Sequence, residues 1–341
     1  MSDLTSDDST QDSTGSQPAR VVSSDVTTSH NKPTQFLDAK FRQKLKKGKF
    51  REVAPIDPML EAPVADTHAH LDMLQDPGLN LARCAVHGVR FVCAMVDLVE
   101  DAQTTYENLD SWLTRASVLV PEIERTAQPC SALPIALPVV RIAIGCHPHY
   151  AKSYTDAHEE LLLAKLADPR TCALGEVGLD YHYDHSPRDV QREVFRRQIR
   201  VAHKARVPIL LHLREAHDDA YEILCEEGFP EAGCVLHCFN LGYDELERWH
   251  KKGCYAAFGG PLTFTSAPEV RDAASQFDTS LTLTETDSPF MAPHPMRGIE
   301  CGPEHTVYTA KVLAEVCNAG PGAERAAFLN SVYDNAIKLL G

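Results

Sequence analysis

The sequence predicts an α/β protein that folds as a (β/α)8 TIM barrel and carries a disordered N-terminal extension. From about residue 60, short apolar runs alternate with longer amphipathic stretches, which is the order expected of repeated strand–helix units. Eight such runs span about 280 residues, close to the roughly 250 residues of a typical single barrel. Most runs are apolar along their whole length, as parallel strands covered on both faces are.

We expect one strand at each apolar run and helices between the strands. The eight predicted strands are 63–67, 89–96, 139–145, 172–176, 208–212, 234–237, 255–258 and 281–285. The predicted helices are 191–204, 243–252, 310–317 and 326–340. The long insert 104–138 follows the second strand, and we expect it to hold one or two further helices.

The N-terminal segment differs in composition from the rest of the chain. Residues 1 to about 38 are rich in Ser, Thr, Asp and Gln, and such a segment cannot bury enough apolar surface to offset its ordering entropy. The basic run from Lys40 to Arg51 is either a solvated linker or an electrostatic handle for an anionic partner. We therefore assign 1–58 to a disordered polar and acidic tail with a basic linker, and 59–341 to the barrel.

Composition restricts the partners and the compartment. The net charge of −15 argues against tight non-specific binding of nucleic acid, which rests on cationic surface. It remains compatible with an enzyme that takes nucleic acid into a locally positive, metal-loaded cleft. Eleven cysteines without CxxC pairs predict reduced thiols in a cytoplasmic protein. The polar, acidic start and the absence of an apolar run near 20 residues predict no secretory signal and no membrane span.

Metal-ligating residues lie where the predicted strands end. His68 and His70 are two residues apart at the end of the first strand, so both imidazoles face one side. Carboxylates or imidazoles end four later strands as well, at Glu176, His212, His237 and Asp287. The carboxyl ends of barrel strands meet on one face, so we expect these six side chains to converge. Such a set can hold two divalent ions, and its ligand types suit Zn, Mn, Mg, Ni or Fe equally.

The motifs around these residues occur in a fixed order from about residue 64 to the C-terminus. They are Asp-Thr-His-Ala-His-Leu-Asp (66–72), Gly-Cys-His-Pro-His (145–149), Gly-Glu-Val-Gly-Leu-Asp-Tyr (175–181), His-Leu-Arg-Glu-Ala (212–216), His-Cys-Phe (237–239), Glu-Thr-Asp-Ser-Pro (285–289) and Asn-Ala (335–336). In combination they resemble the TatD family of metal-dependent hydrolases and deoxyribonucleases, a family of barrel metallohydrolases. The resemblance does not extend to the first 60 residues.

The resemblance implies a role for each ligand. His68 and His70 would hold a first metal together with Asp287, and Glu176 would bridge both metals. His212 and His237 would hold the second metal. Asp287 would also orient or deprotonate the attacking water, and the residues alone favour the same role, since a carboxylate beside a metal-bound water is within reach of its proton. Glu176 and Asp287 are therefore the predicted catalytic residues.

Three further residues are candidates for substrate binding. His147 and His149 would donate to a phosphate or to the leaving oxygen, or else stabilise their own loop. Arg214 would form a fork to a phosphate if it faces the cleft, or else a salt bridge with Glu215 or Asp218.

Two segments depart from the family pattern. In 297–303, Cys301 stands where the family usually has Asn, and it is either a reactive thiol or a small loop filler. The loop after His237, with Asn240–Gly242, is one residue longer than the common form. Both changes put substrate preference in doubt rather than hydrolysis.

Three functions are therefore weighed. The leading hypothesis is a two-metal phosphodiesterase that removes nucleotides from DNA ends as a 3′–5′ exodeoxyribonuclease, preferring single-stranded or frayed ends, and acts as a monomer. The second is a hydrolase of small esters, lactones or phosphoesters on the same barrel, which the acidic charge and altered loops favour. The third is an interaction or regulatory protein with a vestigial metal site, in which the N-terminal segments do the work.

Overall fold

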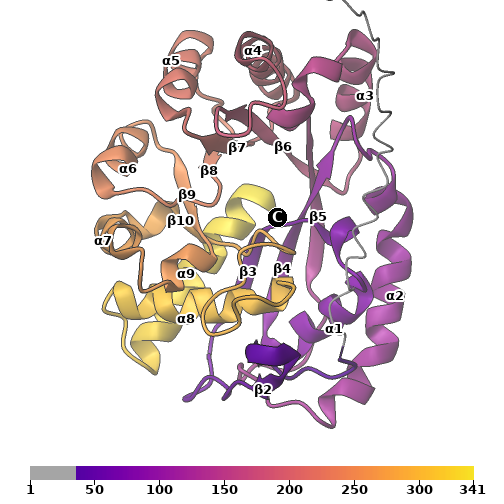
Figure 1. The fold of residues 1–341 in the computed structure, drawn as a ribbon, viewed down its shortest axis with the longest axis vertical. Coiled ribbons are helices and arrows are strands. Elements are labelled where there is room, and N and C mark those ends of the chain that lie inside the picture. The colour runs from indigo at the N-terminus through magenta and orange to yellow at the C-terminus, as the bar shows by residue number, and fades with distance from the viewer. Residues whose placement is uncertain (1–35) are drawn as a thin grey trace, which may run out of the picture. The chain divides into compact units, whose positions relative to one another are not determined.

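A single parallel sheet of eight strands forms the centre of the protein. In the computed structural model, which describes residues 36–341, each strand pairs in parallel with its neighbour in the chain, in the order β3 to β10. The strands are Val64–Ala69 (β3), Val89–Asp97 (β4), Val139–Gly145 (β5), Thr171–Asp180 (β6), Ile209–Arg214 (β7), Cys234–Leu236 (β8), Tyr255–Phe258 (β9) and Thr282–Thr284 (β10). Helices surround the strands (Figure 1), so the predicted (β/α)8 barrel is confirmed.

Polar groups close the barrel between its first and last strands. The Thr67 hydroxyl donates to the Thr284 carbonyl at 3.0 Å, and the Thr284 hydroxyl donates to the Ala65 carbonyl at 2.7 Å. Farther along the seam, the backbone N–H of Asp287 donates to the His68 carbonyl at 2.9 Å. The seam therefore brings two predicted metal ligands, which are separated by most of the chain, to the same place.

Nine α-helices lie in the described part of the chain. They are Pro77–His87 (α1), Thr104–Glu124 (α2), Asp156–Leu166 (α3), Arg188–Ala205 (α4), His217–Glu227 (α5), Tyr243–His250 (α6), Pro268–Gln276 (α7), Thr306–Val316 (α8) and Ala323–Leu340 (α9). The predicted insert 104–138 thus holds one helix. Within residues 36–341, none of the helices is both long and apolar enough to cross a membrane.

Local sequence explains where α1 begins and ends. Asp76 caps its start by accepting from the N–H of Leu79 at 3.1 Å, and Pro77 takes the first helical position, where no N–H is needed. Gly88 ends the helix with a φ of 87°, which is the left-handed conformation that glycine adopts without strain. The chain then passes directly into β4.

The last helix closes the barrel at the end where the strands begin. Ala336 and Leu340 of α9 join Phe91 and Leu283 in a buried cluster of strand side chains. The Asn335 amide donates to the carbonyls of Thr279 and Thr282 at 2.7 and 2.9 Å, just before and at the start of β10. This end is therefore packed, and the site must lie at the opposite end of the strands.

The basic segment before the barrel, for which a solvated linker was one of two interpretations, has regular structure. It forms an antiparallel hairpin of Arg42–Lys44 (β1) and Phe50–Glu52 (β2). Phe41 is buried against the rings of His87, His305 and Tyr308, which come from distant parts of the chain. The predicted disorder of residues 1 to about 38 falls almost entirely outside the described residues.

Candidate metal centre

The carboxylate of Glu176 lies at the middle of the candidate metal centre. Glu176 lies within β6, and its side chain is buried. Three imidazoles face its Oε1 atom: His212 Nδ1 at 2.5 Å, His237 Nε2 at 3.1 Å and His147 Nε2 at 3.9 Å. The Nε2 atoms of His68 and His70 lie 3.4 and 3.7 Å from its other oxygen, Oε2. One carboxylate therefore has histidines on both of its oxygens.

The residues of the first predicted ligand group lie close together. The Nε2 atoms of His68 and His70 lie 3.9 and 3.5 Å from Oδ1 of Asp287, and one ligand atom from each residue lies within 4.8 Å of the others. β3 supplies His68, and His70 follows directly after this strand. Asp287 follows β10 with a φ of 59°, a left-handed conformation that turns its carboxylate toward the histidines.

The ligands on the other side of Glu176 are arranged differently from the set that the resemblance implies. His212 groups with Glu176 and His147, whereas His237 groups with Glu176 and His68. The rings of His68 and His237 stack with their centroids 3.8 Å apart. His147 is thus a candidate metal ligand as well as a candidate for substrate binding.

The donor set fits divalent cations. Both ring nitrogens of His68 are buried without a hydrogen-bond partner among the described residues, and an unpaired buried nitrogen is costly unless something binds it. Burial lowers the pKa of His68, which keeps a lone pair available for a metal. Imidazoles and carboxylates, with no thiolate among them, are ligands for Zn, Mn, Ni, Fe or Mg.

The charges of the two carboxylates are stabilised by the histidines. Burial by itself would raise the pKa of Glu176, but the rings of His237 and His212 hold it well below its usual range. Burial likewise opposes ionisation of Asp287, and the contact with His70 lowers its pKa. Both carboxylates are therefore in the form that binds cations.

Two buried carboxylates that the sequence analysis left without a role support the histidines. Glu285 Oε1 lies 3.4 Å from His237 Nδ1 and accepts from the N–H of Cys238 at 2.7 Å. Asp180 Oδ2 lies 3.2 Å from His212 Nε2 and 2.9 Å from His149 Nε2. The signal for Asp180 is present in the sequence, because residues 176 and 180 of one strand face the same side. Both carboxylates lie beside the rings in the position that the carboxylate partners of metal-binding histidines commonly take.

The three predicted substrate-binding residues lie in different surroundings. His147 and His149 pack edge to face with their ring centroids 4.3 Å apart, and His149 is held by Asp180. Arg214, at the end of β7, places its guanidinium 4.6 Å from the ring centroid of Tyr183. The alternative salt bridges are taken by other residues, since Glu215 pairs with His182 and Asp218 pairs with Arg248.

The two segments that depart from the family pattern have different environments. Cys301 is fully buried, and burial raises the pKa of its thiol well above the usual range, as expected of a loop filler rather than a reactive thiol. Asn240 is exposed in the loop after β8.

Comparisons with known proteins agree with this geometry. Residues 65–341 match the family described as TatD related DNase. The uncharacterized metal-dependent hydrolase YabD of Bacillus subtilis is 39% identical over 174 residues, which cover 51% of this chain and 68% of YabD. The 3′-5′ RNA nuclease TATDN2 of Homo sapiens is 34% identical over 180 residues, which cover 51% of this chain and 24% of TATDN2. The crystal structure of YJJV, a TatD homolog from Escherichia coli K12, superimposes with a TM-score of 0.65 at 25% identity, covering 81% of this chain and 97% of that one.

Proposed function

Because this chain belongs to the TatD family of metal-dependent hydrolases, we propose that it hydrolyses phosphodiester bonds in single-stranded nucleic acid, using two divalent ions. The proposed reaction removes nucleotides from the 3′ end of DNA. A monomer and a cytoplasmic location remain predictions. The eleven cysteines, all of which are free thiols, support that location.

One observation carries the proposal: Glu176 presents its two oxygens to separate groups of ligands. His68 and His70, which group with Asp287, face Oε2, whereas His212, His147 and His237 face Oε1. A carboxylate shared in this way can bridge two ions roughly 3.5–4 Å apart. Bound there, two ions would offset the charge of a phosphodiester and bring the pKa of a water molecule toward neutrality.

The protein supplies the remaining chemistry. Asp287, an ionised carboxylate, accepts the proton of the attacking water, and its contact with His70 fixes its direction. His149 directs its Nε2 toward Asp180, so it would donate to a phosphate oxygen or to the leaving group from Nδ1, in the protonated form of the ring. Arg214 reaches the phosphate from the end of β7, and its stacking on Tyr183 limits the rotamers that it can adopt.

The surface beside the candidate metal centre suits a single strand better than a duplex. Phe290 is 47% exposed, and its ring centroid lies 6.1 Å from that of His70. An exposed aromatic ring beside a metal ligand offers a stacking surface for an unpaired base next to the cleaved bond. Stacking does not distinguish DNA from RNA, and the human relative named as an RNA nuclease makes RNA the second candidate substrate.

The proposal is tested by measuring hydrolysis of several substrates with each of several metal ions. Protein stripped of metal is reloaded with Mg, Mn, Co, Ni or Zn and given a 5′-labelled DNA strand, the matching RNA strand, a chromogenic phosphodiester and a panel of esters and lactones. We expect a ladder that shortens from the 3′ end of DNA, which would be absent with chelator. Intact oligonucleotides with all five ions would overturn the proposal, and turnover of esters or lactones alone would favour the small-molecule hydrolase.

A further inference from the structure

The hairpin of β1 and β2 carries an exposed cluster of cationic side chains, although the chain as a whole has a charge of −15. Its members are Lys44, Lys46, Lys47, Lys49 and Arg51. Among the described residues, no carboxylate forms a salt bridge with any of these five side chains, whereas Lys40 and Arg42 pair with Glu52 and Asp38. The cluster therefore presents unneutralised positive charge on an otherwise acidic protein. It also lies outside residues 65–341, which match the family.

The segments that flank the hairpin are hydrogen-bonded to helices of the barrel. The His87 ring of α1 lies with Nε2 2.6 Å from the Ala39 carbonyl, and Arg83 of α1 donates to the Asp38 carbonyl at 2.8 Å. On the other side, the Tyr308 hydroxyl of α8 donates to the Ala54 carbonyl at 2.9 Å. These contacts fix the base of the hairpin, so the position of the hairpin relative to the barrel does not have to be established when a ligand binds.

The loop that follows Asp287 connects the hairpin to the metal centre. The loop leaves Asp287, runs outward, and returns where the Cys301 N–H donates to the Pro289 carbonyl at 3.1 Å. Gly298 lies on its outer part, and a Cβ placed there would lie 4.0 Å from Cδ of Lys44. The exposed Arg297 immediately precedes Gly298, so the positive charge continues from the hairpin onto this loop.

A cleft lies between the same two elements. It has a volume of about 660 Å³ and is lined by hairpin residues, including Gln43 and Arg51, and by His294, Tyr308 and Lys311 of the loop and α8. Glu52 and Asp57 also line it, and Glu52 is already neutralised by Lys40. A cleft of this size accepts a ligand of small-molecule dimensions. Lys311 is paired with Glu315 at 2.6 Å, so Arg51 is the lining cation that a phosphate would meet.

We propose that the basic hairpin, the cleft and the loop after Asp287 form one binding track for single-stranded nucleic acid leading away from the metal centre. The inference rests on the proposed nuclease function and names how that function would hold the uncleaved part of its substrate. Lysines at the hairpin tip bind phosphates without reading sequence. Although the chain is acidic overall, the cations of the hairpin would attract nucleic acid locally, beside the cleft.

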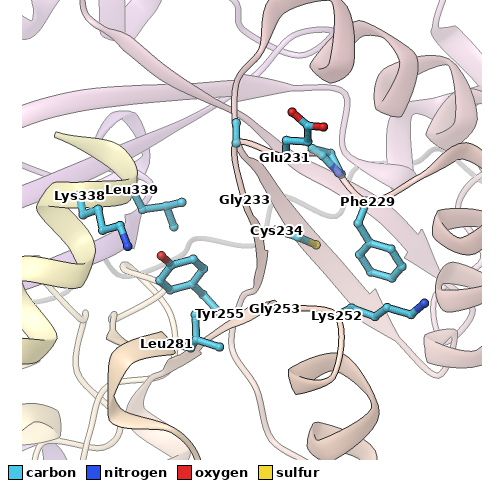
Figure 2. Close-up of a pocket in the computed structure, with 12 residues that line it drawn as sticks. Phe229, Glu231, Gly233, Cys234, Lys252, Gly253, Tyr255, Leu281, Lys338 and Leu339 are labelled. Atoms are coloured by element: carbon cyan, nitrogen blue, oxygen red, sulfur yellow. The ribbon is translucent and has the colours of Figure 1, made fainter.

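Two charge-matched variants test the track. Lys46→Gln/Lys47→Gln/Lys49→Gln removes three charges from the hairpin tip. Lys204→Gln/Lys252→Gln/Lys338→Gln removes three exposed charges at the opposite end of the barrel, where Lys252 and Lys338 line a separate pocket (Figure 2). The readout is the dissociation constant of a labelled DNA or RNA strand, measured with chelator present so that nothing is cleaved, at several salt concentrations.

We expect the hairpin variant to bind about tenfold more weakly than the unaltered chain, and the control variant to bind as the unaltered chain does. The slope of log affinity against log salt should fall by about 2 in the hairpin variant, since each single-strand phosphate contact contributes about 0.7. Unchanged affinity, or an equal loss in both variants at an equal unfolding temperature, would overturn the track. Failure of the nuclease proposal is seen separately, as intact strands when metal is supplied.

Discussion

Glu285 and His237 form a buried pair in which Oε1 of the carboxylate lies 3.4 Å from Nδ1 of the imidazole. The other nitrogen of the same ring, Nε2, faces Glu176 at 3.1 Å. Nδ1 of the ring therefore faces Glu285, whereas Nε2 points into the candidate metal centre. A carboxylate in this position is the usual partner of a metal-binding histidine, because it favours one ring orientation.

The variant Glu285→Gln tests the positioning role of this carboxylate. It keeps the shape of the side chain and the contact with the Cys238 N–H, but removes the charge that orients His237. We expect metal affinity to fall by about 10–100-fold, measured by titration of stripped protein with Zn or Mn. Glu231→Gln, an exposed position near the start of β8, is the control. Equal metal affinity in both variants would mean that the charge of Glu285 has no role in metal binding.

The variant Asp287→Asn tests the proposed base. An amide cannot accept the proton of water and is a weaker ligand, so turnover should fall by about 10²–10⁴-fold. The measurement is kcat on a labelled single strand at saturating metal. Near-normal turnover would show that the proton goes elsewhere and that the assignment of Asp287 is wrong.

The variant Phe290→Ala tests the stacking surface beside His70. Loss of one base–aromatic stack costs about 1–3 kcal/mol, so we expect KM for a single strand to rise about tenfold while kcat changes little. Phe290→Tyr retains the ring and should keep the KM of the unaltered chain. If both variants gave the same KM, the exposed ring would have no role in holding the substrate.

Metal loading should stabilise the folded chain. Ions bind the assembled site and not the unfolded chain, so a concentration of about 100 times the Kd adds about 2.7 kcal/mol to the free energy of unfolding. Thermal unfolding with Mn or Zn should therefore occur at a higher temperature than with chelator. KCl at matched ionic strength is the control, and an equal shift with KCl would exclude specific binding.

The barrel could be predicted from sequence because its strands are continuous apolar runs. The observed strands β5 and β9 have the predicted bounds, whereas β6 continues past Glu176 to Asp180. Of the four added residues only Asp180 is polar, and this buried carboxylate lies against the rings of His149 and His212. Strand ends are hardest to predict where function places charged groups inside the core.

The convergence of the candidate ligands could be predicted from the sequence, whereas their grouping could not. The strand ends predicted that His68, Glu176, His212 and Asp287 converge, because barrel topology alone brings strand ends together. The pairing of His147 with His212, and of His237 with His68, depends on side-chain rotamers that no spacing reveals. The hairpin was missed for another reason: burial of Phe41 depends on contacts with residues near 87 and 305.

The most direct test of the two-metal centre is a crystal of the protein loaded with Mn, measured for anomalous scattering. We predict two peaks roughly 3.5–4 Å apart, one among His68, His70 and Asp287 and the other beside His212, with Glu176 between them. A single peak, or peaks away from Glu176, would contradict the account.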